Sequence, residues 1–247
     1  IRDSVASRGL GDVYKRQRLD IIPSGQWTGM SNPTKLGRLE KLSVSILTDT
    51  SKMLKDAKTE LFADLGGRVL EVGAGTGVNV YFFKEKRVTE WVAVEPDLKL
   101  ADECERAMEE MGGRARVFKG YLHDLDEPQG SFDCVVFSTL LCSVPDPGAI
   151  VRESHSMLKP GGKLYVIEHT KDSYGLRSGA QLLAKVPWKV MTGCNCRNNP
   201  IVALSQEGLW LEGDGDVEMV DAPLRVKKFS PLLELLKPFK MVSLTKK

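Results

Sequence analysis

The sequence predicts an α/β fold with a doubly wound, mostly parallel sheet of seven strands and flanking helices. Short apolar runs alternate along the chain with stretches of helical periodicity, which is the pattern of a parallel sheet covered by helices. The first clear run leads into a glycine-rich turn at residues 73–77, as a strand does when it turns directly into a helix. Hydrophobic residues make up 42% of the 247 residues and charged residues 28%, a balance that suits one soluble domain with a sizeable core.

Seven strands are expected, at short apolar runs that alternate with the helical stretches or follow them. The run Phe132-Asp-Cys-Val-Val-Phe137 is typical of a buried strand, and the turn Pro128-Gln-Gly-Ser131 precedes it. The expected strands are residues 68–72, 91–95, 115–119, 132–137, 163–168, 217–220 and 241–244.

Helices are expected between these strands, and particular residues mark their ends. Gly66-Gly67 stops the first amphipathic stretch, Asp97 can cap a later helix, and Pro147 can occupy the first turn of another. The turn Lys159-Pro-Gly-Gly162 then ends that last helix before the fifth strand. The expected helices are residues 36–65 (one or two helices), 78–85, 97–111, 147–158, 176–191 and 201–209.

Residues 1–29 are not expected to belong to the fold. Residues 1–17 have neither helical nor strand periodicity, and residues 7–17 resemble translated adaptor or vector sequence. A native disordered tail is the alternative. Residues 30–247, opening on Met30, are therefore expected to form a single domain.

Composition narrows the class of protein further. A formal charge of +2 is too mild to indicate nucleic-acid binding, and no apolar stretch reaches the length of about 18–20 residues that crosses a bilayer. An odd, scattered set of cysteines indicates reduced thiols in a cytoplasmic or otherwise intracellular protein. Membrane association is the alternative if a native N-terminal anchor is missing. No metal site is expected, because the closely spaced cysteines Cys194 and Cys196 have no second pair of ligands to complete a site. The cysteines are Cys104, Cys134, Cys142, Cys194 and Cys196.

The most informative motif is Val69-Leu-Glu-Val-Gly-Ala-Gly-Thr-Gly77. Its bare backbone allows positive φ and lets a ligand approach main-chain N–H groups at a helix N-terminus. A dinucleotide site would have a glycine at position 78, where this chain has Val78. An acid, Glu71, lies inside the strand, and Glu95 ends the next strand, where a carboxylate can accept from both hydroxyls of a ribose.

Together with the downstream segments, these residues resemble the class I methyltransferases that depend on S-adenosyl-L-methionine (SAM). Ser131-Phe-Asp-Cys-Val-Val136 resembles the fourth strand of that family, and Leu158-Lys-Pro-Gly-Gly-Lys-Leu164 resembles its turn into the fifth. The resemblance implies a Rossmann-like, type 11 methyltransferase domain, with the cofactor half at about residues 60–170 and the acceptor side at about 170–247. The thiol S-methyltransferase branch fits best, on the segments Leu141-Cys-Ser-Val144, Glu168-His169, Pro187-Trp188 and Gly193-Cys-Asn195.

The resemblance also implies the residues that hold SAM. Those assigned to its methionine end are Glu71, Gly73, Ala74, Gly75 and Gly77 in the turn, with Ser138 and Leu140 beneath. Those assigned to its adenosine end are Glu95 for the ribose, and Pro96, Asp97 and Leu122 around the adenine. Simpler roles remain open, because Glu71 could be a charge at a strand end, Asp97 a helix cap and Ser138 a loop residue. Gly120-Tyr121-Leu122 replaces the frequent Gly-Asp-Ala, so the backbone of Leu122 or the side chain of His123 would serve instead.

The expected function is methyl transfer from SAM to a small, apolar acceptor, with a thiol favoured. His169 is the candidate catalytic residue, since a neutral imidazole at the end of the fifth strand could accept a thiol or hydroxyl proton; a histidine that only satisfies a backbone carbonyl is the alternative. The other functions left open are carbon or oxygen methylation of quinones or lipids, and SAM binding without catalysis. Residues 229–239 could contact a membrane surface or dock on the core as a helix.

Overall fold

The fold is described from a computed structural model of the chain. The expected tail at 1–29, the expected helix at 176–191 and most of the stretch at 229–239 lie outside the described residues, as do Cys194 and Cys196. The structure describes residues 53–84, 87–170, 199–205, 209–210, 219–223 and 239–247.

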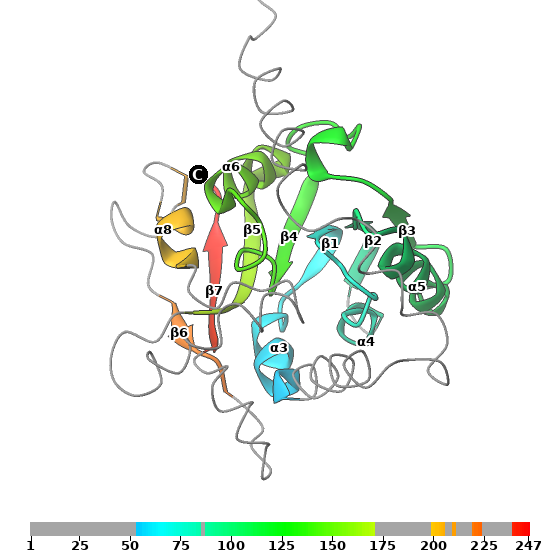
Figure 1. Cartoon of the computed structure of the whole chain (residues 1–247), viewed down its shortest axis with the longest axis horizontal. Helices are drawn as coiled ribbons and strands as arrows, with labels where there is room; N and C mark the ends of the chain where they lie inside the picture. The colour runs from blue at the N-terminus through cyan, green and yellow to red at the C-terminus, as the bar shows by residue number, and fades with distance from the viewer. Residues whose placement is uncertain (1–52, 85–86, 171–198, 206–208, 211–218, 224–238) are drawn as a thin grey trace, which may run out of the picture. The chain divides into compact units, whose positions relative to one another are not determined.

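A seven-stranded sheet in the order β3-β2-β1-β4-β5-β7-β6 forms the centre of the fold (Figure 1). The first five strands are parallel, and β7 is antiparallel to both β5 and β6. This confirms the predicted α/β, mostly parallel, seven-stranded sheet. The strands are β1 (Gly66–Val72), β2 (Arg87–Val94), β3 (Ala115–Phe118), β4 (Phe132–Ser138), β5 (Leu158–His169), β6 (Val220–Asp221) and β7 (Phe239–Thr245).

Helices cover both faces of the sheet. Buried residues of three helices form one hydrophobic cluster with every second residue of the central strands, such as Val69 and Val136. The intervening residues, such as Leu70 and Val135, are equally buried and point to the opposite face, so each strand is apolar on both sides. None of the described helices is long and apolar enough to cross a membrane. The helices are α3 (Lys55–Leu61), α4 (Val80–Phe83), α5 (Leu98–Met108), α6 (Pro147–Met157) and α8 (Pro200–Leu204), with 3-10 turns η1 (Glu109–Met111) and η2 (Leu122–Asp124).

Aromatic side chains fix α3 and α4 to the sheet. Phe62 lies edge-on to Phe83 and to Tyr165, with ring centroids 5.6 and 6.1 Å apart. Phe83 in turn lies edge-on to Trp91 at 5.1 Å. Fully buried aromatic residues contribute about 1.5–3 kcal/mol each by burial alone. Because α4 follows the glycine turn directly, these contacts also hold that turn against the sheet.

Several element boundaries differ from those expected: β2 begins at Arg87 rather than at residue 91, and α8 ends at Leu204 rather than at residue 209. Two further differences have a clear structural reason. β5 begins at Leu158 rather than at residue 163, because Leu158 already pairs with Phe132 and the turn residues 159–162 form a bulge before pairing resumes at Lys163. α4 begins at Val80 rather than at residue 78, because the glycine turn continues further, with the N–H of Val80 bonded to the carbonyl of Gly77 at 3.0 Å.

Candidate functional site

The loops that carry the predicted site residues follow neighbouring strand ends. Val72 at the end of β1 pairs with Val94 of β2 and with Phe137 of β4, and Ser138 pairs with Ile167 of β5. Since these strands are parallel, their following loops meet at one edge of the sheet. The strand order reverses between β1 and β4, and ligands of open α/β sheets bind at such a switch point.

Each glycine of the turn has its own structural reason. All three have positive φ, at +71° for Gly73, +57° for Gly75 and +74° for Gly77, as the sequence predicts. A Cβ on Gly73 would lie 2.6 Å from the Leu140 side chain, and one on Gly77 would lie 3.1 Å from the Cα of Cys104 in α5. A Cβ on Gly75 would meet no described atom within 4 Å. The turn is therefore packed at both ends and open at its middle, which is the space a ligand on the backbone needs.

Glu95 is tied to the open part of the turn. Its Oε2 accepts the N–H of Gly75 at 2.8 Å and its Oε1 accepts the N–H of Asp97 at 3.0 Å. Burial raises the pKa of Glu95, and these two backbone donors oppose that rise. A carboxylate has about four lone-pair positions, so two remain for the hydroxyls of a ribose. The side chain therefore fits its predicted role while already held in place.

Asp97 is a helix cap, which is the simpler of the two roles predicted for it. Its Oδ1 accepts the N–H groups of Lys99 at 2.9 Å and Leu100 at 3.1 Å, which makes it the N-cap of α5. Pro96, the preceding residue, is exposed at the rim. Contacts of either residue with an adenine ring stay predictions.

Glu71 lies behind the turn in a buried polar chain. Lys58 of α3 donates to Oδ1 of Asn79 at 2.9 Å, and Asn79 donates to Oε1 of Glu71 at 2.5 Å. Burial raises the pKa of Glu71 and lowers the pKa of Lys58, while their opposite charges work against both shifts. The indole of Trp91 lies close enough to lower the pKa of Glu71 somewhat. Within the described part of the chain, Oε2 of Glu71 accepts no hydrogen bond of good geometry, so this buried acceptor can still take a donor.

The loop after β3 contributes a ring pair at the rim. Tyr121 is 38% exposed, and its ring is stacked on that of His123 with centroids 5.7 Å apart and planes 10° apart. Leu122 begins η2 and is buried. The departure from Gly-Asp-Ala thus places an aromatic pair where a carboxylate is frequent, and the predicted backbone contact at Leu122 is untested.

The loop after β4 is held by a residue whose role the sequence did not indicate. Glu168, completely buried at the end of β5, accepts the N–H groups of Leu140 at 2.6 Å, Leu141 at 2.8 Å and Cys142 at 3.4 Å. Ser138, the last residue of β4 before this loop, is half-buried. The available signal was an acid at the end of an otherwise apolar strand.

His169 lies at the expected edge and is packed on an aromatic ring. It is 2% exposed, and its ring centroid is 5.3 Å from that of Phe239, with a tilt of 40°. Phe239 is also its partner across the β5–β7 pairing. The role of His169 as a base stays a prediction. Among the described residues, no group of three His, Cys, Asp or Glu side chains is arranged to hold a metal ion.

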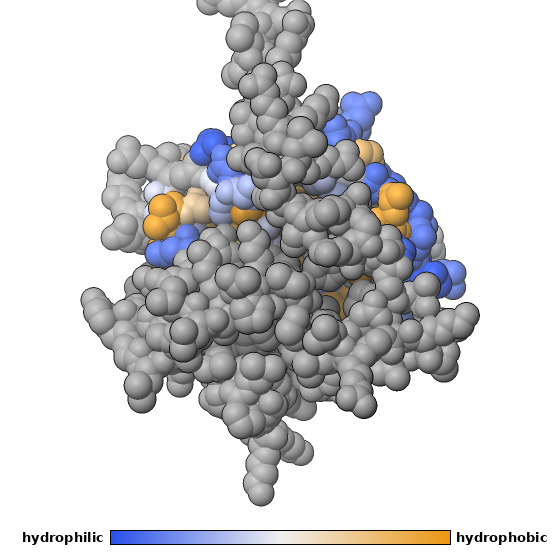
Figure 2. All heavy atoms as spheres, in the orientation of Figure 1, coloured by the Kyte–Doolittle hydropathy of each residue, from blue (hydrophilic) through white to orange (hydrophobic). Residues whose placement is uncertain are grey.

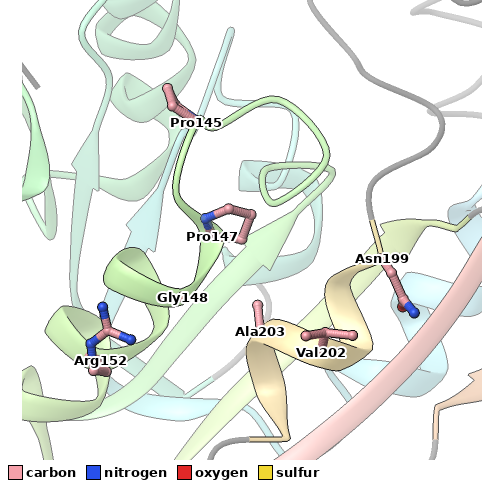
Figure 3. A pocket seen from close by; sticks show the side chains of 7 residues that line it. All are labelled: Pro145, Pro147, Gly148, Arg152, Asn199, Val202 and Ala203. Carbon is pink, nitrogen blue, oxygen red and sulfur yellow. The ribbon is translucent and has the colours of Figure 1, made fainter. Parts of the chain in front are cut away.

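A separate hollow lies between the N-terminus of α6 and α8 (Figure 3). Its lining is mostly apolar, with one guanidinium group, and includes none of the predicted cofactor residues. The lining residues are Pro145, Pro147, Gly148, Arg152, Asn199, Val202 and Ala203.

Comparisons with known proteins indicate the same class of protein as the geometry of the site. The sequence model of the family described as "Methyltransferase domain" matches residues 47–200. The human thiol S-methyltransferase TMT1B is 30% identical over 147 residues, which is 53% of this chain and 58% of that protein. A ubiquinone biosynthesis O-methyltransferase of Xanthomonas oryzae pv. oryzae is 33% identical over 129 residues, covering 49% and 52%. The match thus spans little more than half the length of these two relatives.

The fold is also similar to that of solved methyltransferases. The geranyl diphosphate C-methyltransferase of Streptomyces coelicolor A3(2), solved with S-adenosyl-L-homocysteine, superposes with a TM-score of 0.59 at 17% identity. The match covers 88% of this chain and 86% of that one. At this identity the likeness concerns the fold alone.

Proposed function

The chain belongs to the methyltransferase domain family, as a class I SAM-dependent methyltransferase, and we propose that it methylates a small, apolar acceptor, with a thiol favoured. The family, the fold and the cofactor predicted from the sequence are thereby confirmed. The main structural support for a cofactor site in this chain is the open space at Gly75 beside the carboxylate of Glu95.

The described residues fit SAM at both of its ends. Glu95 is oriented by the N–H groups of Gly75 and Asp97 and would accept from the ribose hydroxyls. Oε2 of Glu71, which accepts no hydrogen bond of good geometry from the described residues, would accept, directly or through water, from the ammonium group of the methionine end. Leu140, packed on the glycine turn, would form the floor beneath that end.

Methyl transfer asks mainly for alignment. When bound, SAM supplies a methyl group on a sulfonium that leaves as a neutral thioether. The protein then has to hold the acceptor in line and exclude water, and such positioning can contribute up to ~7–11 kcal/mol. Rigid strand ends carry the cofactor residues, which suits this task, and no metal or covalent intermediate is needed.

A thiol is favoured over other acceptors by the segments shared with the thiol S-methyltransferase branch and by the TMT1B relatives. An unperturbed thiol has a pKa near 8.5, so its reactive thiolate forms readily above neutral pH. His169 would then help chiefly near neutrality, by accepting the thiol proton. Oxygen methylation of a quinone-type acceptor is the second candidate, supported by the Xanthomonas oryzae relative.

We propose an intracellular location on cysteine usage. Two of the described cysteines, Cys104 and Cys134, are buried and belong to no disulfide. Reduced, unpaired thiols are typical of proteins from reducing compartments.

The test is incubation with labelled SAM and a panel of thiols, phenols, quinones and lipids, with the product identified by mass. A thiol acceptor predicts activity that climbs with pH at subsaturating thiol, and His169→Ala should retain much of this activity at high pH. His155→Ala is the matched control, because that imidazole bonds the Leu209 carbonyl and packs on Trp210, away from the predicted cofactor residues. A methylated phenol or quinone and no methylated thiol would reject the thiol and favour the second candidate. SAM binding with no product from any acceptor would instead favour a binding protein without catalysis.

A further inference from the structure

The carboxylate of Glu168 organises the loop that follows β4. It is completely buried, and one of its oxygens, Oε1, accepts both short bonds, from the N–H groups of Leu140 and Leu141. Oε2 accepts the longer bond from Cys142. Three successive backbone donors therefore converge on one side chain from the neighbouring strand, as they would on an anion.

The loop adopts a conformation that needs such support. Thr139 has φ +59°, and among the described residues it is the one non-glycine with positive φ. A β-branched residue is strained in this region, and strain of this kind persists where surrounding contacts over-determine the backbone. Here the N–H of Thr139 bonds the Ile167 carbonyl at 2.8 Å, and Glu168 fixes the residues that follow. β5 thus holds the loop on both sides of the strained residue.

The held loop reaches the glycine turn. A Cβ built on Gly73 would lie 2.6 Å from Cδ1 of Leu140, so the Leu140 side chain occupies the place that a larger residue at 73 would need. The N–H of Gly73 is itself bonded to the Val94 carbonyl of β2 at 2.8 Å. One line of contacts therefore runs from Glu168 through Leu140 to the turn.

We propose that Glu168 is a positioning residue for the cofactor site: by holding the amides of Leu140 and Leu141, it seats Leu140 against Gly73 and sets the floor beneath the methionine end of SAM. The proposal rests on the proposed function, because it assumes that SAM binds over this turn. Glu168 needs no contact with the cofactor for this role. The requirement is a buried acceptor at the Oε1 position.

That requirement separates two substitutions of similar shape. In Glu168→Gln, an amide oxygen at the Oε1 position can still accept both short bonds. This substitution therefore removes only the negative charge and the longer bond from Cys142. In Glu168→Leu, the loop amides lose their acceptor. We expect the affinity for S-adenosyl-L-homocysteine, measured by calorimetry, to fall about tenfold or more in Glu168→Leu and to stay within about threefold of wild type in Glu168→Gln.

A destabilised variant elsewhere on β5 provides the control. Leu164→Ala removes a fully buried side chain from the middle of the same strand, where Leu164 pairs with Val135 and Leu244. Its melting temperature should fall while its affinity stays that of wild type. Equal affinity losses in Leu164→Ala and Glu168→Leu would assign the effect to general stability and overturn the proposal.

A milder variant keeps the proposal testable if Glu168→Leu does not fold. Glu168→Asp retains the charge but is one methylene shorter, and it should speed hydrogen exchange over residues 139–144 in the free protein while β4 and β5 stay protected. Unchanged exchange together with unchanged affinity would overturn the proposal. A folded wild type that binds neither SAM nor its product would instead refute the proposed function.

Discussion

Gly75 and Gly112 have almost the same positive φ angle at two different places in the fold. Their φ angles are +57° and +59°, and a Cβ on either would meet no described atom within 4 Å. Gly75 lies in the turn after β1, whereas Gly112 ends the helical segment before β3, at the opposite edge of the sheet. Substitution of each by alanine therefore imposes the same strain, and only the methyl group on residue 75 would enter the predicted cofactor space.

The size of each effect follows from this geometry. A left-handed conformation costs a residue with a Cβ roughly 1–2 kcal/mol, and a less flexible unfolded chain offsets about 0.4–1 kcal/mol of that cost. Both variants should thus lose about 1 kcal/mol of unfolding free energy, or roughly 2–4 °C in melting temperature. Gly77→Ala should lose more, because its Cβ would press on the α5 backbone at 3.1 Å, and overpacking adds typically 1–3 kcal/mol.

Calorimetric titration with S-adenosyl-L-homocysteine, beside thermal melting of the same samples, separates binding from stability. Gly75→Ala should bind at least about tenfold more weakly, a difference of about 1.4 kcal/mol, while Gly112→Ala should bind as wild type does. Equal affinities for these two variants would refute the placement of the cofactor over Gly75. A melting temperature for Gly77→Ala at or above that of Gly112→Ala would refute the packing argument.

Three further predictions concern carboxylates and their partners. Glu95→Ala removes the ribose acceptor and should weaken SAM binding by about 1–3 kcal/mol; unchanged affinity in calorimetry would reject the ribose assignment. Asn79→Ala leaves the buried Lys58 and Glu71 without their shared partner, so urea denaturation should show a loss of about 1–3 kcal/mol or more, and a neutral result would contradict the buried chain. Burial and a nearby acid raise the pKa of Glu153 from 4.5 to about 7. The folded state therefore favours the protonated form of Glu153. The stability that this side chain contributes is fully present below pH 4.5 and is lost as pH rises through 7. Glu153→Gln should match wild type near pH 4 and melt higher than wild type at pH 8, and a pH-independent difference would count against the shift.

Local rules account for what could be predicted from the sequence. Positive φ at Gly73, Gly75 and Gly77 follows from the need to turn from a strand into a helix with bare backbone. The α5 cap at Asp97 is likewise a property of a few consecutive residues. The central strands could be placed because both of their faces are buried, which makes each a continuous apolar run.

Long-range polar contacts could not be predicted in this way. Glu168 meets amide groups that lie 26–28 residues earlier in the chain, and no local pattern encodes such a contact. Lys58 resembles a solvated residue of an amphipathic helix, yet it is buried because Asn79, 21 residues later, accepts its hydrogen bond. The start of β5 was misplaced for a related reason, since the Leu158–Phe132 pairing precedes a bulge that only the neighbouring strand defines.

The position of β7 has a consequence for the chain during its synthesis on the ribosome. β5 has β4 on one side and β7 on the other, and β7 is synthesised some seventy residues after β5 ends. Until residue 245 emerges, the nascent sheet presents the backbone of β5 as an open edge, and open apolar edges invite pairing with other chains. The strand that covers β5 in the finished sheet is therefore among the last parts of the chain to be synthesised, so the exposure of this edge lasts for most of the time between the synthesis of β5 and the release of the chain.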